Sequence, residues 1–268
     1  MQRLKDKVAV VTGAAMGIGK GIAEAFVREG AKVVVADMND EVGKQTVEEL
    51  KAAGGDAVFV HVDISDEDQV KNVYDVTVKT YGGLDILVNN AGVYNVETEK
   101  IHELETSKWK RLVDINLNGT FMMCKHAIPI IIKAKDPCII NMSSPAGQDL
   151  SMRAAYGATK GAIIQLTKSI AMQYPGKIRA NAICPGSTDT PGRNVSRKTS
   201  VHAKGSVAQL LQRDGKPRDV AAAAVFIASE GNFMNAAVLR IDGGLTSQRP
   251  KPEDLAPWKE DDEVEKFF

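Results

Sequence analysis

A tyrosine and a lysine stand four residues apart in the segment Tyr156-Gly157-Ala158-Thr159-Lys160. On a helix, this spacing places both side chains on one face, close enough for the ammonium to act on the phenol. A free tyrosine has a pKa of about 10, so it transfers protons poorly near neutral pH. A neighbouring lysine stabilises the phenolate and is expected to lower that pKa, as general acid–base catalysis requires. The same pair also occurs on solvated helix faces, so its meaning depends on the rest of the chain.

Short β-branched runs alternate with helical patterns along most of the chain. The first run ends at a glycine-rich turn, and an apolar helical pattern then leads to a second run. A strand, a helix and a strand within about 30 residues predict parallel pairing with a right-handed crossover. The continued alternation predicts strands over 7–12, 32–37, 56–62, 84–89, 138–142, 179–184 and 237–241, with further helices around 41–53, 67–81, 107–133, 155–173 and 217–228.

Seven strands alternating with six helices predict an α/β fold, a doubly wound (Rossmann) seven-stranded parallel sheet with helices on both faces. No linker divides the pattern, so we expect a single domain over residues 1–248 and a polar C-terminal tail over 249–268. The polar, basic stretch 191–214 falls outside the alternation, and we interpret it as a substrate lid, with disorder as the alternative. We interpret the tail as a solvated extension, with packing on a neighbouring subunit as the alternative.

The composition argues against several classes of partner and site. Thirty-four basic and 34 acidic residues cancel, so neither nucleic acid nor an anionic membrane is an expected partner. No apolar run approaches the ~20 residues of a membrane span, and no signal-peptide core is present at the N-terminus, so we expect a cytoplasmic protein. The three cysteines and four histidines are scattered, which argues against disulfides, a metal site and a serine–histidine triad.

The turn after the first predicted strand is suited to a dinucleotide. Gly13, Gly17 and Gly19 allow the backbone to approach a pyrophosphate. The helix that follows offers free N–H groups and a partial positive charge. The turn therefore predicts a nucleotide site.

Asp37 ends the second predicted strand. A carboxylate at this place accepts hydrogen bonds from both adenosine ribose hydroxyls and repels a 2′-phosphate. Neither Met16 nor Met38 supplies a positive charge for such a phosphate, so NAD is favoured over NADP. A helix N-cap is the alternative role for Asp37, although Asn39 and Asp40 could cap the helix instead.

Several motifs occur in one order along the chain. They are Thr12-Gly13 with Gly17-Ile18-Gly19, Asn89-Asn90-Ala91-Gly92, Asn116, Ser143-Ser144, Tyr156 with Lys160, and Pro185-Gly186. In this order they resemble the short-chain dehydrogenase/reductase (SDR) family, over about residues 5–245. The resemblance implies that Tyr156 exchanges a proton with the substrate oxygen and that Lys160 lowers its pKa and holds the nicotinamide ribose. It also implies that Ser144 hydrogen-bonds the substrate oxygen and that Asn116 keeps a water-linked proton relay in place.

The resemblance further implies a set of cofactor contacts. Asp63 resembles the residue that hydrogen-bonds the adenine amino group, and Asn89 the residue that braces neighbouring strands. Thr188 and Thr190 resemble the polar contacts of the nicotinamide carboxamide. The full expected set is Gly13, Met16, Gly17, Ile18, Gly19, Asp37, Asp63, Asn90, Ala91, Gly92, Tyr156, Lys160, Pro185, Gly186, Thr188 and Thr190.

The sequence leaves one choice and one departure from the family pattern. The family's active serine usually stands three residues before a glycine, as Ser144 stands before Gly147, but it also usually lies 13 residues before the tyrosine, which reaches Ser143. We take Ser144 and assume that the loop before Tyr156 is one residue short. Ala236 stands where the family commonly has glycine, and we interpret it as a packing variation.

These features predict an NAD-dependent alcohol dehydrogenase that interconverts a secondary alcohol and its ketone. A hydroxysteroid or bile-acid-like alcohol, a polyol and a cyclic alcohol are all compatible substrates. Val93, Tyr94, Leu150 and Met152 offer apolar walls, which favours a ring. Arg153 could receive a carboxylate, but a solvated surface charge is its favoured role.

Two other functions and two assemblies stay open. The alternatives are an NADPH-dependent carbonyl reductase of the same family and a non-catalytic NAD-binding redox sensor. The resemblance implies a homotetramer, or a homodimer, that pairs helices 107–133 and 155–173.

Overall fold

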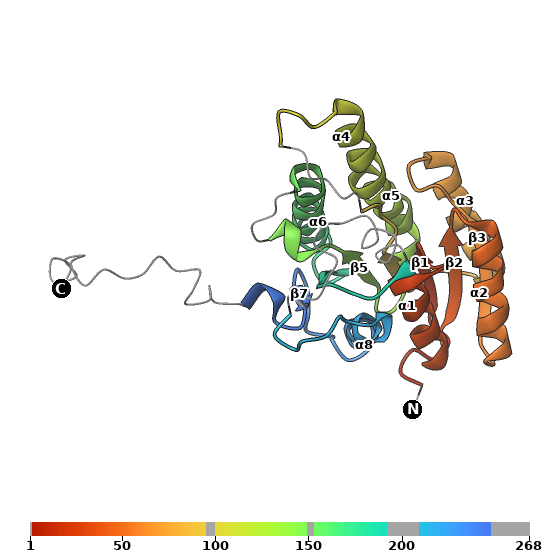
Figure 1. Ribbon diagram of the computed structural model, residues 1–268. Helices are drawn as coiled ribbons and strands as arrows, with labels where there is room; N and C mark the ends of the chain where they lie inside the picture. Colours follow the sequence, from red (N-terminus) through yellow and green to blue (C-terminus); the bar gives the residue numbers. More distant parts are fainter. Residues whose placement is uncertain (1, 95–99, 149–152, 192–208, 248–268) are drawn as a thin grey trace, which may run out of the picture.

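The computed structural model describes residues 2–94, 100–148, 153–191 and 209–247, which build a seven-stranded sheet between two layers of helices (Figure 1). All pairs are parallel, and the order is β3-β2-β1-β4-β5-β6-β7. The strands are β1 (Val8–Thr12), β2 (Lys32–Asp37), β3 (Asp56–His61), β4 (Ile86–Asn89), β5 (Cys138–Met142), β6 (Arg179–Pro185) and β7 (Val238–Ile241). The predicted doubly wound α/β fold is confirmed.

Helices cover both faces of the sheet. The α-helices are α1 (Gly17–Arg28), α2 (Asp40–Ala52), α3 (Glu67–Tyr81), α4 (Thr106–Leu112), α5 (Thr120–Ile131), α6 (Ala154–Gln173) and α8 (Pro217–Ala228). Helices α1, α2 and α8 share one apolar core with the sheet, and α3, α5 and α6 share the other. Every residue of β1, β4 and β5 is buried, so the central strands are mostly apolar and show no alternation of apolar and polar residues.

The strand order reverses between β1 and β4. From β1 the chain proceeds outward through β2 and β3, then returns to β4 and proceeds the other way to β7. The loops that leave the carboxyl ends of β1 and β4 therefore diverge, which opens a crevice at the usual ligand site of such folds.

One predicted helix differs in the structure. The sequence predicts a single helix over 107–133, but α4 and α5 are separated by a π-helical segment, η1 (Val113–Gly119). A π-helical turn carries an extra residue, which sequence periodicity does not reveal, and such turns are frequent at functional sites.

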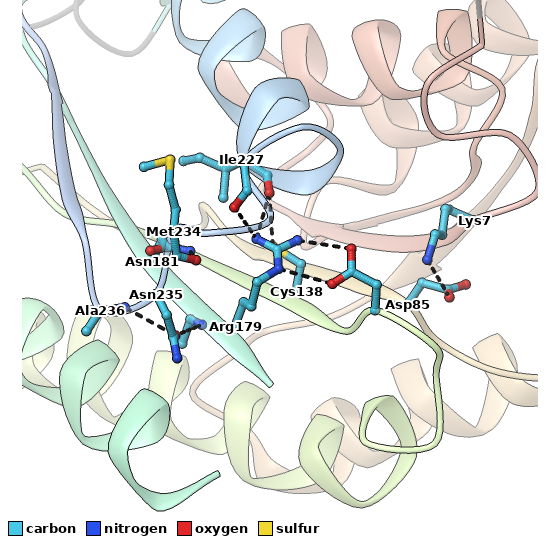
Figure 2. Close-up of polar contacts among 12 residues, drawn as sticks. Lys7, Asp85, Cys138, Arg179, Asn181, Ile227, Met234, Asn235 and Ala236 are labelled. Carbon is cyan, nitrogen blue, oxygen red and sulfur yellow. Dashed lines mark hydrogen bonds and ion pairs between the residues drawn. The ribbon is translucent and has the colours of Figure 1, made fainter. Parts of the chain in front are cut away.

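Polar contacts close the amino edge of the sheet, opposite that crevice. Arg179, the first residue of β6, binds Asp136 through Nε and Nη2, at 3.1 and 3.2 Å. Its Nη1 donates to the carbonyl oxygens of Ile227 and Gly231 at 2.9 and 3.1 Å, as Figure 2 shows for the end of α8. The Arg179 guanidinium therefore joins the start of β6 to the segment just before β5 and to the end of α8.

Ala236, before β7, has a φ of 58°. This left-handed conformation is costly for any residue with a Cβ. The N–H of Ala236 donates to the Ala180 carbonyl at 2.9 Å and also to Asn235 Oδ1 at 3.2 Å, the contact drawn in Figure 2. The departure from the family's glycine therefore concerns backbone conformation and not only packing.

Most of the proposed lid and all of the tail over 249–268 lie outside the described residues. Within the described part of the chain, no helix combines the length and apolarity that crossing a membrane requires.

Candidate active site

A cleft follows the carboxyl edge of the sheet, over the point where the strand order reverses. Its volume is about 2420 Å3, larger than the roughly 300–1,000 Å3 of sites for one small ligand. All but two of the residues predicted for the site line it: Gly13, Met16, Gly17, Ile18, Asp37, Asp63, Asn90, Ala91, Gly92, Ser144, Tyr156, Lys160, Pro185, Gly186, Thr188 and Thr190. Gly19 and Asn116 are the two exceptions, and both lie behind its wall.

Tyr156 and Lys160 lie in the first turns of α6. The Lys160 Nζ is 5.8 Å from the centre of the Tyr156 ring. Burial raises the pKa of Tyr156 to about 12, although a hydrogen bond with Ser144 and the charge of Arg153 oppose this. In the protein without a bound ligand, burial therefore outweighs the nearby polar groups, and the lowering of this pKa by Lys160 stays a prediction.

Lys160 is buried and directed into the sheet edge. Its Nζ donates to the Met142 carbonyl at 2.9 Å. Burial lowers the pKa of Lys160 to about 8. The amine therefore changes charge close to neutrality, which suits a group that holds or passes a proton.

The two candidate serines have different surroundings. The Ser143 hydroxyl donates to the Lys160 carbonyl at 2.7 Å and is buried. The Ser144 hydroxyl hydrogen-bonds Tyr156 and accepts from the Ala146 N–H at 3.2 Å. Ser143 fastens β5 to α6, whereas Ser144 adjoins the phenol.

Asn116 lies fully buried in the π-helical segment η1. Its side chain makes two bonds with the backbone of Val93: Oδ1 accepts from N at 2.8 Å and Nδ2 donates to O at 3.0 Å. Its own carbonyl accepts from the Thr120 hydroxyl at 2.7 Å. Asn116 therefore fixes the loop after β4 to η1, beside Gly92, and its Nδ2 also donates to the Thr159 hydroxyl of α6 at 3.5 Å.

Two glycines permit a tight turn between β1 and α1. Gly13 has a φ of 63°, and a Cβ there would lie 2.8 Å from the Ala91 Cα. A Cβ on Gly19 would overlap the Gly13 carbonyl. The turn thus brings backbone amides at the start of α1 to the cleft with no side chain in the way, the cradle that a pyrophosphate requires.

Asp37 lines the cleft beside the glycine turn. Its Oδ2 accepts from the Ala15 N–H at 2.9 Å and its Oδ1 from the Asn39 N–H at 3.0 Å. Asn39 itself caps α2, accepting from Val42 N at 3.1 Å. Asp37 is therefore not the helix cap but a carboxylate held against the glycine turn.

Thr12 is a site residue that sequence reasoning placed in a motif without a role. Its hydroxyl accepts from the N–H groups of Asn90 and Ala91, both at 3.0 Å. The Asn90 amide in turn donates to the carbonyls of Thr12 and Gly13, at 3.0 and 3.1 Å. Together they lock the two loops that form opposite walls of the crevice.

Four more of the residues singled out in the sequence make polar or packing contacts within the protein. Asn89 Nδ2 donates to Asn141 Oδ1 at 2.8 Å, which joins β4 to β5. Asp63 Oδ1 accepts from the N–H and the hydroxyl of Ser65. The Thr188 hydroxyl donates to Gly186 O at 3.1 Å. The Thr190 side chain lies beside Gly17, so the segment after β6 meets the start of α1.

Arg153 and Tyr94 form a stack beside Tyr156 in the cleft. The Arg153 Cζ is 4.6 Å from the centre of the Tyr94 ring, and both residues line the cleft. The prediction of a solvated surface charge for Arg153 is therefore wrong. Val93 is also part of the lining, while Leu150 and Met152 lie outside the described residues.

No group of metal-ligating side chains gathers among the described residues. The three cysteines are buried and unpaired.

The chain is similar to several known oxidoreductases. Residues 13–246 match the family model described as Enoyl-(Acyl carrier protein) reductase. A 2,5-dichloro-2,5-cyclohexadiene-1,4-diol dehydrogenase of Sphingobium indicum is 37% identical, covering 90% of this chain and 97% of that protein. The L-fucose dehydrogenase of Oryctolagus cuniculus is 38% identical, covering 90% and 86%. The ligand-free aldohexose dehydrogenase of Thermoplasma acidophilum superposes with a TM-score of 0.81 at 37% identity, covering 93% of this chain and 98% of that one. The chain therefore belongs to the short-chain dehydrogenase/reductase family.

Proposed function

We propose that this protein is an NAD-dependent dehydrogenase that interconverts a secondary alcohol and its ketone, with Tyr156 as the general acid–base. The observation that carries the proposal is the meeting of Tyr156, Ser144 and Lys160 at one end of a cleft whose other end presents Asp37. A hydride carrier and a proton acceptor can thus reach one carbon–oxygen bond.

The residues fit a bound dinucleotide. The Gly13–Gly19 turn would receive the pyrophosphate, Asp37 the adenosine ribose, and Thr188 and Thr190 the carboxamide. When bound, NAD supplies the hydride acceptor, and the protein supplies orientation and proton transfer.

In the oxidation direction, the phenolate of Tyr156 takes the proton of the substrate hydroxyl. Ser144 donates a hydrogen bond to the substrate oxygen, which holds it beside Tyr156. Lys160 stabilises the phenolate, and the proton leaves toward the Lys160 and Asn116 side of the site. The reverse direction uses Tyr156 as the acid for the ketone oxygen.

Asp37 supports NAD over NADP. A 2′-phosphate near this carboxylate would meet like charge, and Met16 and Met38 offer no cation to offset it. The alternative, an NADPH-dependent carbonyl reductase, requires the opposite preference. Initial rates with both cofactors decide between them.

The substrate class follows from the walls and the relatives. The cleft near Tyr156 is lined by Val93, Tyr94 and Ala146, which suit an apolar ring edge. The relatives named above act on a cyclohexadiene diol, on L-fucose and on an aldohexose. We therefore propose a ring-shaped alcohol, either a cyclic alcohol or a polyol in ring form, with hydroxysteroids as a larger variant.

The test is absorbance at the reduced-nicotinamide band with a panel of such alcohols. Turnover that is lost in Tyr156→Phe supports the proposal. Cofactor binding without turnover of any panel member would favour a redox sensor instead.

We also propose a homotetramer or homodimer built on α4, α5 and α6. Trp109 on α4 and Phe121 on α5 are 39% and 49% exposed, a large apolar area for helix faces. Light scattering gives the mass, and Phe121→Glu is expected to reduce it. The cytoplasmic location stays a prediction, to be tested by cell fractionation.

A further inference from the structure

Three side chains form a continuous stack between the start of α6 and the loop after β4. The Tyr94 and Tyr156 ring centres are 5.2 Å apart with an interplanar angle of 85°, an edge-to-face contact. The Arg153 guanidinium lies 4.6 Å from the Tyr94 ring centre. A cation over a ring is attracted by the ring quadrupole. The stack therefore fixes where the Arg153 charge lies relative to the Tyr156 phenol.

Besides Arg153, Lys160 is the cation that lies against Tyr156, and Cys184 and Ser144 bring no positive charge. Lys160, one turn along α6, donates to a backbone carbonyl, and burial lowers its pKa to about 8. Cys184 of β6 is a buried thiol whose ionised form would oppose the phenolate. Ser144 contributes a hydrogen bond but no charge.

Arg153 differs from these groups in keeping its charge. A guanidinium is a permanent cation in proteins, whereas burial lowers the pKa of the Lys160 amine to about 8. The charge of Arg153 lowers the pKa of Tyr156. Its hold on Tyr94 also restricts the side-chain freedom that a solvated arginine would have.

We propose that Arg153, held against Tyr94, is a positioning residue that stabilises the Tyr156 phenolate and thereby sets the pH range of the reaction. The consequence for catalysis rests on the proposed function. The electrostatic link between Arg153 and Tyr156 does not, because it can be measured without turnover.

The direct test is the ionisation of Tyr156 itself. The chain has five tyrosines, so 3-fluorotyrosine labelling gives few 19F resonances, and the one lost in Tyr156→Phe identifies Tyr156. In the Arg153→Gln protein we expect the titration midpoint of Tyr156 to rise by about half a pH unit or more, which is the size of effect expected for loss of one partly screened charge. Lys79→Gln, which removes an exposed charge from α3, is the matched control and leaves the midpoint in place.

Three further variants test the stack. Tyr94→Leu removes the ring that holds the guanidinium. In this variant the titration midpoint of Tyr156 is therefore expected to rise, as in Arg153→Gln. Tyr94→Phe keeps the ring, so the titration midpoint of Tyr156 is expected to stay at the wild-type value. Arg153→Lys keeps the positive charge. Its Tyr156 midpoint is therefore expected to lie closer to the wild-type value than the midpoint in Arg153→Gln does. If Arg153→Gln does not fold, the two Tyr94 variants still test whether the stack affects the ionisation of Tyr156.

The kinetic counterpart is the pH profile of kcat/KM for alcohol oxidation. In Arg153→Gln the rising limb moves to higher pH by the same amount, so the rate below the limb falls by about 3-fold. A folded Arg153→Gln protein whose 19F midpoint and limb both stay in place overturns the proposal. So does a rise confined to KM for carboxylated substrates, which would assign the guanidinium to substrate binding. Full turnover by Tyr156→Phe would instead refute the proposed function and leave the 19F result standing.

Discussion

The Ser143 hydroxyl donates to the Lys160 carbonyl at 2.7 Å, so this serine joins β5 to α6. Its neighbour Ser144 hydrogen-bonds Tyr156 instead. We therefore predict that Ser144→Ala lowers kcat by about 10²-fold or more, as loss of a donor to a reacting oxygen does. Ser143→Ala should mainly cost stability, about 1 kcal/mol for one buried hydrogen bond. Steady-state kinetics and urea unfolding of both variants separate the roles, and the reverse pattern would assign the chemistry to Ser143.

Asp37 and Asn39 offer a matched pair for the cofactor. Asp37→Ala should raise kcat/KM with NADP relative to NAD by roughly 10-fold or more, because the repulsion of the 2′-phosphate is lost. Asn39→Ala removes the α2 cap, so it costs about 1 kcal/mol of stability with an unchanged cofactor ratio. An unchanged ratio in Asp37→Ala would refute the role given to this carboxylate.

Ala236 adopts a left-handed backbone at φ 58°. Ala236→Gly should raise the free energy of unfolding by about 0.5–1 kcal/mol, since relief of the conformational cost exceeds glycine's loss of entropy. Ala237→Gly, at a neighbouring position without positive φ, should lower it by a similar amount. Urea denaturation measures both, and a destabilised Ala236→Gly would show that packing dominates here.

Glu29 binds Arg3 at 2.6 Å, which ties the N-terminal segment to the end of α1. The hydrogen bond from the Arg3 side chain lowers the pKa of Glu29 to about 2, from a usual value of 4.5. A lowered pKa in the folded state gives stability that is complete above pH 4.5 and is lost as the pH falls toward 2. The stability difference between wild type and Glu29→Gln should therefore shrink from pH 6 to pH 3. A constant difference in unfolding experiments would exclude this linkage.

The fold could be predicted from the sequence because the central strands are buried on both faces. Runs such as residues 8–12 and 32–37 carry no polar alternation, and glycine or aspartate ends them. The π-helical segment around Asn116 could not be predicted, since sequence periodicity does not reveal its extra residue and the residue that Asn116 binds, Val93, lies in another loop.

The site could be placed from its motifs, but its electrostatics could not. The pKa of Tyr156 depends on burial by segments far apart in the chain, and the sequence pattern alone suggested the opposite direction. The stack of Arg153 on Tyr94 likewise needs the loop after β4 and the start of α6 to meet. A lone arginine three residues before a tyrosine gives no such signal.

Replacement of Tyr156 by phenylalanine tests the central proposal most directly. The variant keeps the ring in its contact with Tyr94 and removes only the hydroxyl. With NAD and a ring-shaped secondary alcohol that the wild type oxidises, we expect kcat to fall by about 10²–10⁴-fold while NAD still binds. Wild-type kcat in this variant would contradict the assignment of Tyr156 as the proton-transfer group.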